Sequence, residues 1–239
     1  MSEQQSKAQP AIVGQVERFL TYVHSNSVRT SRESGLIASE SLQETVRLFD
    51  PTAGRYGYLP DERYYPEVFF VDTLCRFSGM MTLPDGELGV SQYGYLYLSR
   101  QPDRRLVMLA SAFVNDYPWA VLFPRGALAA RIAKQRADAL QFVLSLKAGS
   151  QTQIDKFAAE LGGHLGITLD DKNPPYPSLI LEWVLRHILI TPLVRLGAMR
   201  LFSQDGAAVN DIKSASLLEL TEAGKALLTL REVRYAGAR

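Results

Sequence analysis

The 239-residue chain has few of the residues that build catalytic and metal centres. Its single cysteine, Cys75, excludes an internal disulfide and a cysteine-based zinc site within one chain. Its three histidines, His24, His164 and His187, lie far apart and lack the close pairing of a helix metal site. Neither a Gly-x-Ser-x-Gly motif nor a complete phosphate-binding loop is present. We therefore expect a protein that is not an enzyme, with no catalytic residue, no metal and no cofactor.

Long hydrophobic runs are missing too. The segments 127–130 and 188–190 are far shorter than the roughly 18 residues that a membrane helix requires. The N-terminal residues MSEQQSKAQP are polar and do not resemble a signal peptide. Hydrophobic residues nevertheless make up 46% of the chain, enough for the core of one large domain or two smaller ones. We expect a cytoplasmic protein with no membrane partner.

A large net charge is the third missing feature. The formal net charge is +1, which speaks against a protein that binds DNA over its whole surface. The charges are unevenly distributed, however. Residues 1–90 carry eight basic and twelve acidic side chains, whereas residues 91–140 carry seven basic and three acidic ones. The middle of the chain is therefore its basic part.

Most of the chain shows apolar residues at helical spacing, and short apolar runs occur near the end of each half. The spacing predicts helices over residues 12–23, 36–49, 66–77, 91–98, 102–113, 127–146, 153–161, 179–196 and 222–230. We expect Gly162 and Gly163 to stop one of these helices and Pro192 to kink another. A polar break is expected at 24–34. Strands are predicted within 80–90, 197–202 and 215–221.

The two halves close on the same pattern. SQYGYLYL at 91–98 and TEAGKALL at 221–228 match at the hydroxyl residue and at the glycine three positions later. Each follows a helix, a glycine and two short strands, which indicates one supersecondary unit used twice. We predict that the hydroxyl of Ser91 or Thr221 caps the helix that follows. Gly94 and Gly224 would then allow that helix to pack closely.

Three helices, a two-stranded wing and the segment LELTEAGKALL resemble the winged-helix family. Residues 69–116 are similar to the winged-helix-like modules of bacterial proteins related to XPB-type helicases. The resemblance covers residues 12–115 and, more loosely, 127–230. It implies a mostly α fold with small β-hairpins, in which two winged-helix-like units stand in tandem, joined by helices. The units would span 11–115, with trailing helices, and 116–239, with a basic C-terminal tail.

This resemblance also implies a function. Winged-helix proteins typically bind double-stranded DNA, with the third helix in the major groove and the wing on the backbone. Many such domains bind only proteins, however. The third helix of the first unit carries Glu67 and Asp72 against Arg76, and these charges would repel phosphate. The first unit is therefore also interpreted as a packing module.

RYGYLPDERYY, residues 55–65, is the first candidate nucleic-acid segment. Arginine binds phosphate and tyrosine stacks on bases, which makes Arg55, Tyr58, Arg63 and Tyr64 candidate contacts. The alternative is that the tyrosines pack the loop onto the core while Asp61 and its neighbour Glu62 are solvated.

Further candidates are basic side chains in the second unit. They are Arg131, Lys134 and Arg136 on one predicted helix, Arg186 in the third helix, Lys213 in the wing loop and Arg234 in the tail. A solvated helix face and a solubilising tail are the alternatives. We expect a non-enzymatic protein that binds double-stranded DNA, or a DNA-associated subunit that contacts other proteins of a larger complex. The alternative is a protein–protein interaction scaffold without nucleic-acid binding, which the near-neutral charge favours.

Overall fold

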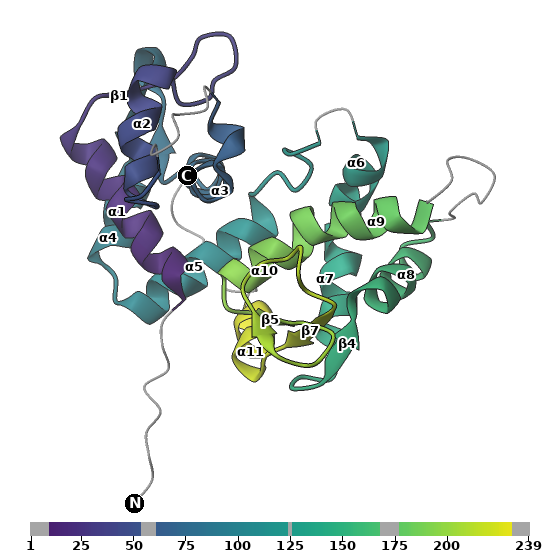
Figure 1. The fold of residues 1–239 in the computed structure, drawn as a ribbon. Coiled ribbons are helices and arrows are strands. Elements are labelled where there is room, and N and C mark those ends of the chain that lie inside the picture. Colours follow the sequence, from purple (N-terminus) through teal and green to yellow (C-terminus); the bar gives the residue numbers. More distant parts are fainter. Residues whose placement is uncertain (1–9, 54–60, 124–125, 168–176, 231–239) are drawn as a thin grey trace, which may run out of the picture. The chain divides into compact units, whose positions relative to one another are not determined.

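The computed structural model of the protein describes residues 10–53, 61–123, 126–167 and 177–230 (Figure 1). These residues are mostly helical with small antiparallel sheets, as predicted. They divide into two compact units, with unit 1 running to Tyr117 and unit 2 starting at Pro118. Within the described ranges, no helix is long and apolar enough to cross a membrane.

Unit 1 begins with a helix, a strand and two helices, and continues with two strands and two helices (Figure 1). Its elements are α1 (Ala11–Ser25), β1 (Val28–Arg29), α2 (Ser39–Arg47), η1 (Glu62–Tyr64), α3 (Pro66–Phe77), β2 (Met81–Thr82), η2 (Pro84–Gly86), β3 (Glu87–Val90), α4 (Gln92–Ser99) and α5 (Pro102–Asn115). Strand β3 lies in the middle of the sheet and pairs antiparallel with β1 and β2.

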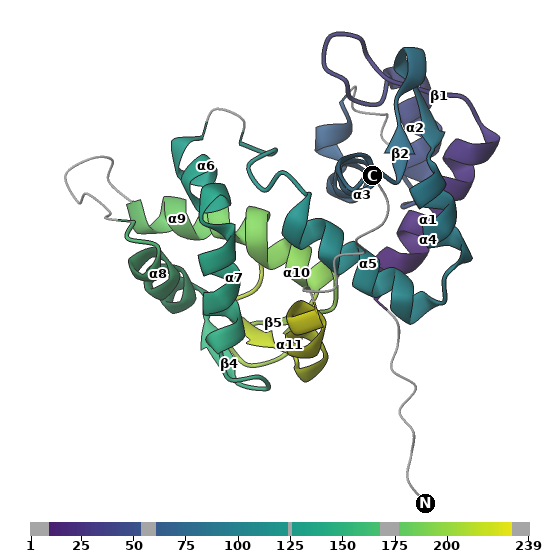
Figure 2. The same ribbon diagram turned by 180° about the vertical axis from the view of Figure 1, so that it is seen from behind.

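From its second helix onward, unit 2 follows the order of unit 1 as far as the helix after the last strand, with one additional strand. Its elements are α6 (Ala127–Lys134), α7 (Arg136–Ser145), β4 (Gln151–Gln153), α8 (Ile154–His164), α9 (Pro177–Leu185), the π-helix η3 (Arg186–Ile190), α10 (Thr191–Arg195), β5 (Met199–Phe202), β6 (Ala208–Val209), β7 (Leu217–Leu220) and α11 (Glu222–Thr229). Figure 2 shows α6, α7 and α8 of this unit from the opposite side. We count the helices of this unit from α7, so that α9 is its third helix. Strand β7 again lies between the strand after the first helix, β4, and the strand that follows the α9–α10 segment, β5.

The helical periodicity is confirmed where one helix face is buried. The apolar residues at helical spacing in 12–23 are all buried in α1, which packs against α3 and α5; they are Ile12, Val13, Val16, Phe19, Leu20 and Val23. Helix α3, the third helix of unit 1, has the predicted bounds, Pro66 to Phe77, with proline in its first turn. Burying such a face is the main source of stability for helices of this length.

A tight corner follows the third helix of unit 1. Gly79 has a left-handed backbone (φ 76°), which turns the chain out of the helix. The N–H of Ser91 then donates to the carbonyl oxygen of Met80 (3.0 Å). The Ser91 hydroxyl donates to Gly79 O (2.6 Å) and accepts from the N–H of Gly94 (3.1 Å), so it caps α4 as predicted.

Unit 2 builds the same corner from different residues. Gly197 is left-handed (φ 71°), and the N–H of Thr221 donates to the carbonyl oxygen of Ala198 (3.0 Å). The Thr221 hydroxyl donates to Gly197 O (3.1 Å) and accepts from the N–H of Gly224 (2.8 Å), which caps α11. The predicted match between the two segments therefore extends to each hydrogen bond of the corner.

The glycines at the two corners are required by close approach. A Cβ added to Gly94 would lie 2.3 Å from the carbonyl oxygen of Met80, and one added to Gly224 would lie 2.1 Å from that of Ala198. The close packing that these glycines allow is thus against the backbone of the residue that leads out of the third helix.

Several predicted boundaries are wrong, for identifiable reasons. The helix predicted over 127–146 is two helices, because Gln135 is non-helical (φ −99°, ψ 27°) and its side chain donates to Leu165 O (3.2 Å). Gly162 and Gly163 do not stop α8. Gly162 instead gives room to Leu181 of α9, whose Cδ2 would lie 2.6 Å from an added Cβ.

Other differences concern short or irregular elements. The helix predicted from residue 36 begins at Ser39, since residues 36–38 form the loop after β1. The helix predicted over 179–196 contains the π-helix η3 just before Pro192, which cannot donate a backbone bond. Strand β1 lies in the segment expected to be a polar break, and β4 and β6 were not predicted.

We predict that Gly94→Ala and Gly224→Ala each destabilise their unit by about 1–3 kcal/mol, because the new methyl group meets a backbone carbonyl that cannot rotate away. Gly163→Ala is the matched control. Gly163 is also helical, but nothing lies within 4 Å of an added Cβ, so we expect a gain of about 0.5–1 kcal/mol. Urea unfolding measures all three, and corner variants as stable as the parent would contradict the close approach.

Candidate interaction surface

The third helix of unit 2 leaves an apolar face uncovered. Leu179, Ile180 and Trp183 of α9 expose 56%, 43% and 52% of their surface. On the other side of the same helix, Leu181 and Leu185 are fully buried, and α9 packs against α8 and α6. Three neighbouring large apolar side chains on one exposed helix face are typical of an interaction site rather than of scattered surface residues.

Aromatic neighbours hold the exposed tryptophan in place. The ring of Trp183 lies 4.8 Å from that of Phe123, edge to face, and 5.0 Å from that of His187. His187 Nδ1 is 2.7 Å from the carbonyl oxygen of Trp183, one turn earlier. Because these contacts restrict the indole on one side, its exposed part is ordered before any partner binds, which lowers the entropic cost of binding.

Basic side chains lie on helix α6, which packs against α9. Arg131 and Lys134 are both exposed, and Nη2 of Arg131 donates to the carbonyl oxygen of Gly166 (2.6 Å). Arg136, at the start of α7, places its guanidinium 5.7 Å from the ring centroid of the buried Trp119. These three predicted nucleic-acid residues are thus on neighbouring helices, and two of them also make contacts within the unit.

Two more of the predicted residues, Arg186 and Lys213, lie at or near the loop between β6 and β7 of unit 2. Arg186 is partly buried and donates to Glu182 Oε1 (2.7 Å), Ile212 O (2.6 Å) and Ala215 O (3.1 Å). It therefore ties the third helix to the loop before β7, and these contacts use most of its donors. Lys213 lies in that loop and is exposed.

The remaining predicted residues belong to unit 1 or lie outside the described residues. Arg63 forms an ion pair with Asp61, and Tyr64 is 62% exposed. Arg55, Tyr58 and Arg234 lie in the parts of the chain that the structure does not describe. The ten candidates are thus divided between two units.

The third helix of unit 1 offers no comparable exposed face. Every residue of α3 from Val68 to Cys75 is buried. Asp72, expected to repel phosphate, does not face solvent. It is fully buried and forms an ion pair with Arg76.

Glu62 is a residue whose role the sequence did not reveal, since it was expected to be solvated and is fully buried. Its Oε2 accepts from the N–H of Ile37 (2.6 Å), and its Oε1 lies 3.8 Å from Arg76 Nη2. Burial, and then the nearby charge of Asp72, raise the pKa of Glu62 to about 8. Burial also raises the pKa of Asp72. One guanidinium thus faces two buried carboxyl groups, and the site retains a proton near neutral pH.

Other places for chemistry are sparse in the part of the chain that the structure describes. No group of three or more His, Cys, Asp or Glu side chains there is placed to hold a metal ion. Cys75 is buried, and burial raises its pKa, so its thiol is unreactive.

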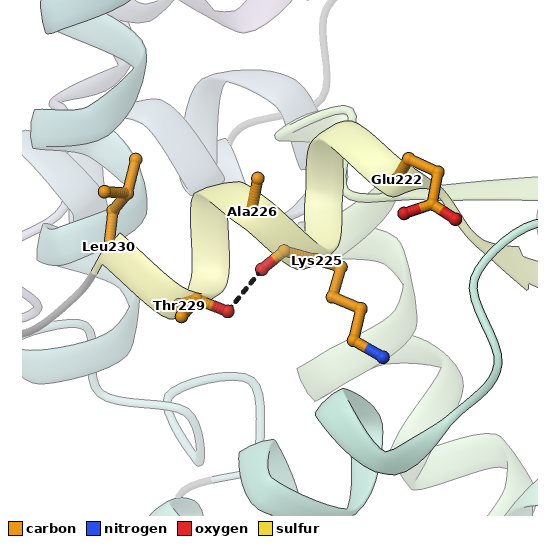
Figure 3. A pocket seen from close by; sticks show the side chains of 5 residues that line it. All are labelled: Glu222, Lys225, Ala226, Thr229 and Leu230. Atoms are coloured by element: carbon orange, nitrogen blue, oxygen red, sulfur yellow. Dashed lines mark hydrogen bonds between the residues drawn. The ribbon is translucent and has the colours of Figure 1, made fainter.

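An open hollow of about 460 Å³ lies along α11, and Figure 3 shows the side chains that line it. It is lined by Glu222, Lys225, Ala226, Thr229 and Leu230. The Thr229 hydroxyl donates to the carbonyl oxygen of Lys225 (2.7 Å). Because the lining residues all come from α11 and the residue that follows it, the hollow encloses a small molecule poorly.

Comparison of the chain with protein-family models, with curated proteins and with solved structures gave no match.

We predict that unit 1 loses stability as pH rises from about 4.5 to about 8. Glu62 has a raised pKa in the folded state, so its contribution is fully present below its unfolded pKa and is lost as pH rises through the folded one. The slope for one proton is at most about 1.4 kcal/mol per pH unit. Glu62→Gln should remove this part of the pH dependence, whereas the same change at the exposed Glu67 should retain it. Urea unfolding at a series of pH values measures the difference, and equal slopes in the parent and Glu62→Gln would contradict the assignment.

We further predict that the exposed apolar face contributes little to folding. Leu179→Ser should change the free energy of unfolding by less than about 0.5 kcal/mol, because the side chain is already half in water. Leu181→Ala, two residues along the same helix, should cost about 2–5 kcal/mol because it empties a buried site. Chemical denaturation compares the two, and a large loss for Leu179→Ser would place this residue in the core.

Proposed function

We propose that each unit is a winged helix and that the chain is a non-enzymatic protein-interaction scaffold, a subunit of a larger complex. The winged-helix assignment is supported by the order helix, strand, helix, helix, strand, strand, to which unit 2 adds one strand. It is also supported by the last strand of each unit, which lies between two other strands of its sheet. The repeated corner at Ser91 and Thr221 supports one architecture used twice. Fold alone does not decide between DNA and protein as the partner.

The observation that carries the choice is the surface of the third helix in each unit. A winged helix that reads DNA needs hydrogen-bond donors and positive charge on that helix. Helix α3 buries every residue from Val68 to Cys75. Helix α9 exposes Leu179, Ile180 and Trp183. The leucine and isoleucine side chains have no group that hydrogen-bonds to a base edge, and all three residues match the apolar and aromatic anchors of protein interfaces.

Binding to double-stranded DNA is the second candidate. It is favoured by the exposed basic residues Arg131 and Lys134 on α6, and by Lys213 in the loop before β7. These side chains could contact phosphates without base recognition. In that case the protein would be a DNA-associated subunit whose affinity depends on salt.

We predict that the full chain does not bind a fluorescently labelled DNA duplex of about 30 base pairs, which is about three helical turns. The reason is that neither third helix offers a cationic, donor-rich surface. Fluorescence anisotropy from low to physiological salt measures this binding. The double variant Lys134→Glu with Lys213→Glu, which changes two exposed side chains, serves as the control. Affinity that falls with salt and weakens in this variant would instead support the DNA-associated subunit.

A further inference from the structure

Helices α8 and α6 both pack against α9 and differ in charge: α8 carries Asp155, Lys156 and Glu160, with Lys156 paired to Glu160, whereas the charges of α6 are all positive. Helix α6 contains Arg131 and Lys134 and no acidic residue, and residues 117–137 contain no Asp or Glu at all. The one acidic residue of α9, Glu182, is neutralised by Arg186 at 2.6 Å. A partner that lies across α9 and α6, and not across α8, therefore meets an apolar strip with positive charge on its α6 side.

The face also restricts the backbone conformation of its partner. From Ile180 onward the backbone N–H groups of α9 are bonded within the helix, so most of the face offers side chains rather than free backbone groups. An extended peptide would leave its own backbone groups without partners at such a contact. A helix satisfies its backbone internally and presents apolar residues three and four positions apart, which suits the single-turn spacing of Leu179, Ile180 and Trp183.

From these two observations we infer that α9 and α6 together bind an amphipathic helix of another protein, with an apolar face and acidic flanking residues. The inference rests on the proposed function, because it names the partner chemistry of the same surface. A second copy of the chain is a poor fit, since a two-fold contact would bring the positively charged surface of α6 from both copies into one interface. Duplex DNA would satisfy the charges but not the apolar face.

Trp183 provides a direct test on the full chain. The protein has two tryptophans, and Trp119 is 1% exposed, so collisional quenching of fluorescence reports mainly on Trp183. Relative to the quenching of free N-acetyltryptophanamide by each ion, iodide should quench more efficiently than caesium, because the positive side chains attract the anion. Lys134→Glu should reduce this preference. The same iodide-to-caesium ratio as for free N-acetyltryptophanamide would overturn the positive environment on which the inference depends.

Binding is tested with two designed helical peptides that have identical Leu and Phe positions. One carries Glu beside the apolar face, and its twin carries Lys. We expect the acidic peptide to protect Trp183 from acrylamide, to bind more weakly as salt increases, and to bind at least tenfold more tightly than its twin. By anisotropy of a labelled peptide, Trp183→Ala should weaken binding by about thirtyfold, the effect typical of an interface anchor.

Charge variants distinguish binding of the acidic peptide beside α6 from its general attraction to any positive side chain of the protein. Lys134→Glu should weaken the acidic peptide by about two- to fivefold, as expected for an exposed ion pair. Lys147→Glu is the matched control, because Lys147 is exposed and follows the far end of α7, which is about 15 Å long. An equal effect of the two variants would contradict a site beside α6.

The possible failures are distinguishable. Equal affinity of the two peptides, or no protection of Trp183 by either, would overturn the acidic-helix inference and leave the scaffold proposal to its own test. Protection of Trp183 by duplex DNA would overturn both. Protection that increases with protein concentration in the absence of peptide would identify a second copy as the occupant, and would overturn the inference alone.

Discussion

Both units depend on a glycine in the first turn of the helix that follows the last strand, because only a residue without a side chain fits there. At Gly94 and Gly224, the first turn of a helix lies against the carbonyl oxygen of the residue that leads out of the third helix. A hydroxyl side chain three positions earlier bonds the same corner. The end of the third helix, the start of one strand and the end of another all meet there, so this single contact sets the frame of the unit.

The common frame leaves the third helix free to differ between the units. In unit 1 this helix is buried from Val68 to Cys75, and Asp72 takes part in a buried ionic cluster. In unit 2 the equivalent helix continues through a π-helical segment and leaves Leu179, Ile180 and Trp183 exposed. A duplicated architecture therefore carries two different surfaces, and the function is decided by the surface rather than by the fold.

The sequence predicted features that depend on residues close together in the chain, such as α1, α3 and the capped corners. It did not predict β1 and β4, because they are short and polar and form only by pairing with strands far along the chain. The burial of Glu62 was missed because it depends on Ile37 and Arg76. Periodicity marks Leu179 and Ile180 as apolar, but only the tertiary structure reveals that nothing in the described chain covers them.

The buried carboxyl group of Glu62 affects the measured enthalpy of unfolding as well as the stability of unit 1. Between about pH 4.5 and 8, unit 1 takes up a proton when it folds and releases it when it unfolds. That proton comes from the buffer, so the enthalpy of unfolding measured by calorimetry includes the enthalpy of buffer ionisation. The same unfolding transition will therefore absorb different amounts of heat in Tris and in phosphate at one pH, although the protein itself undergoes an identical change.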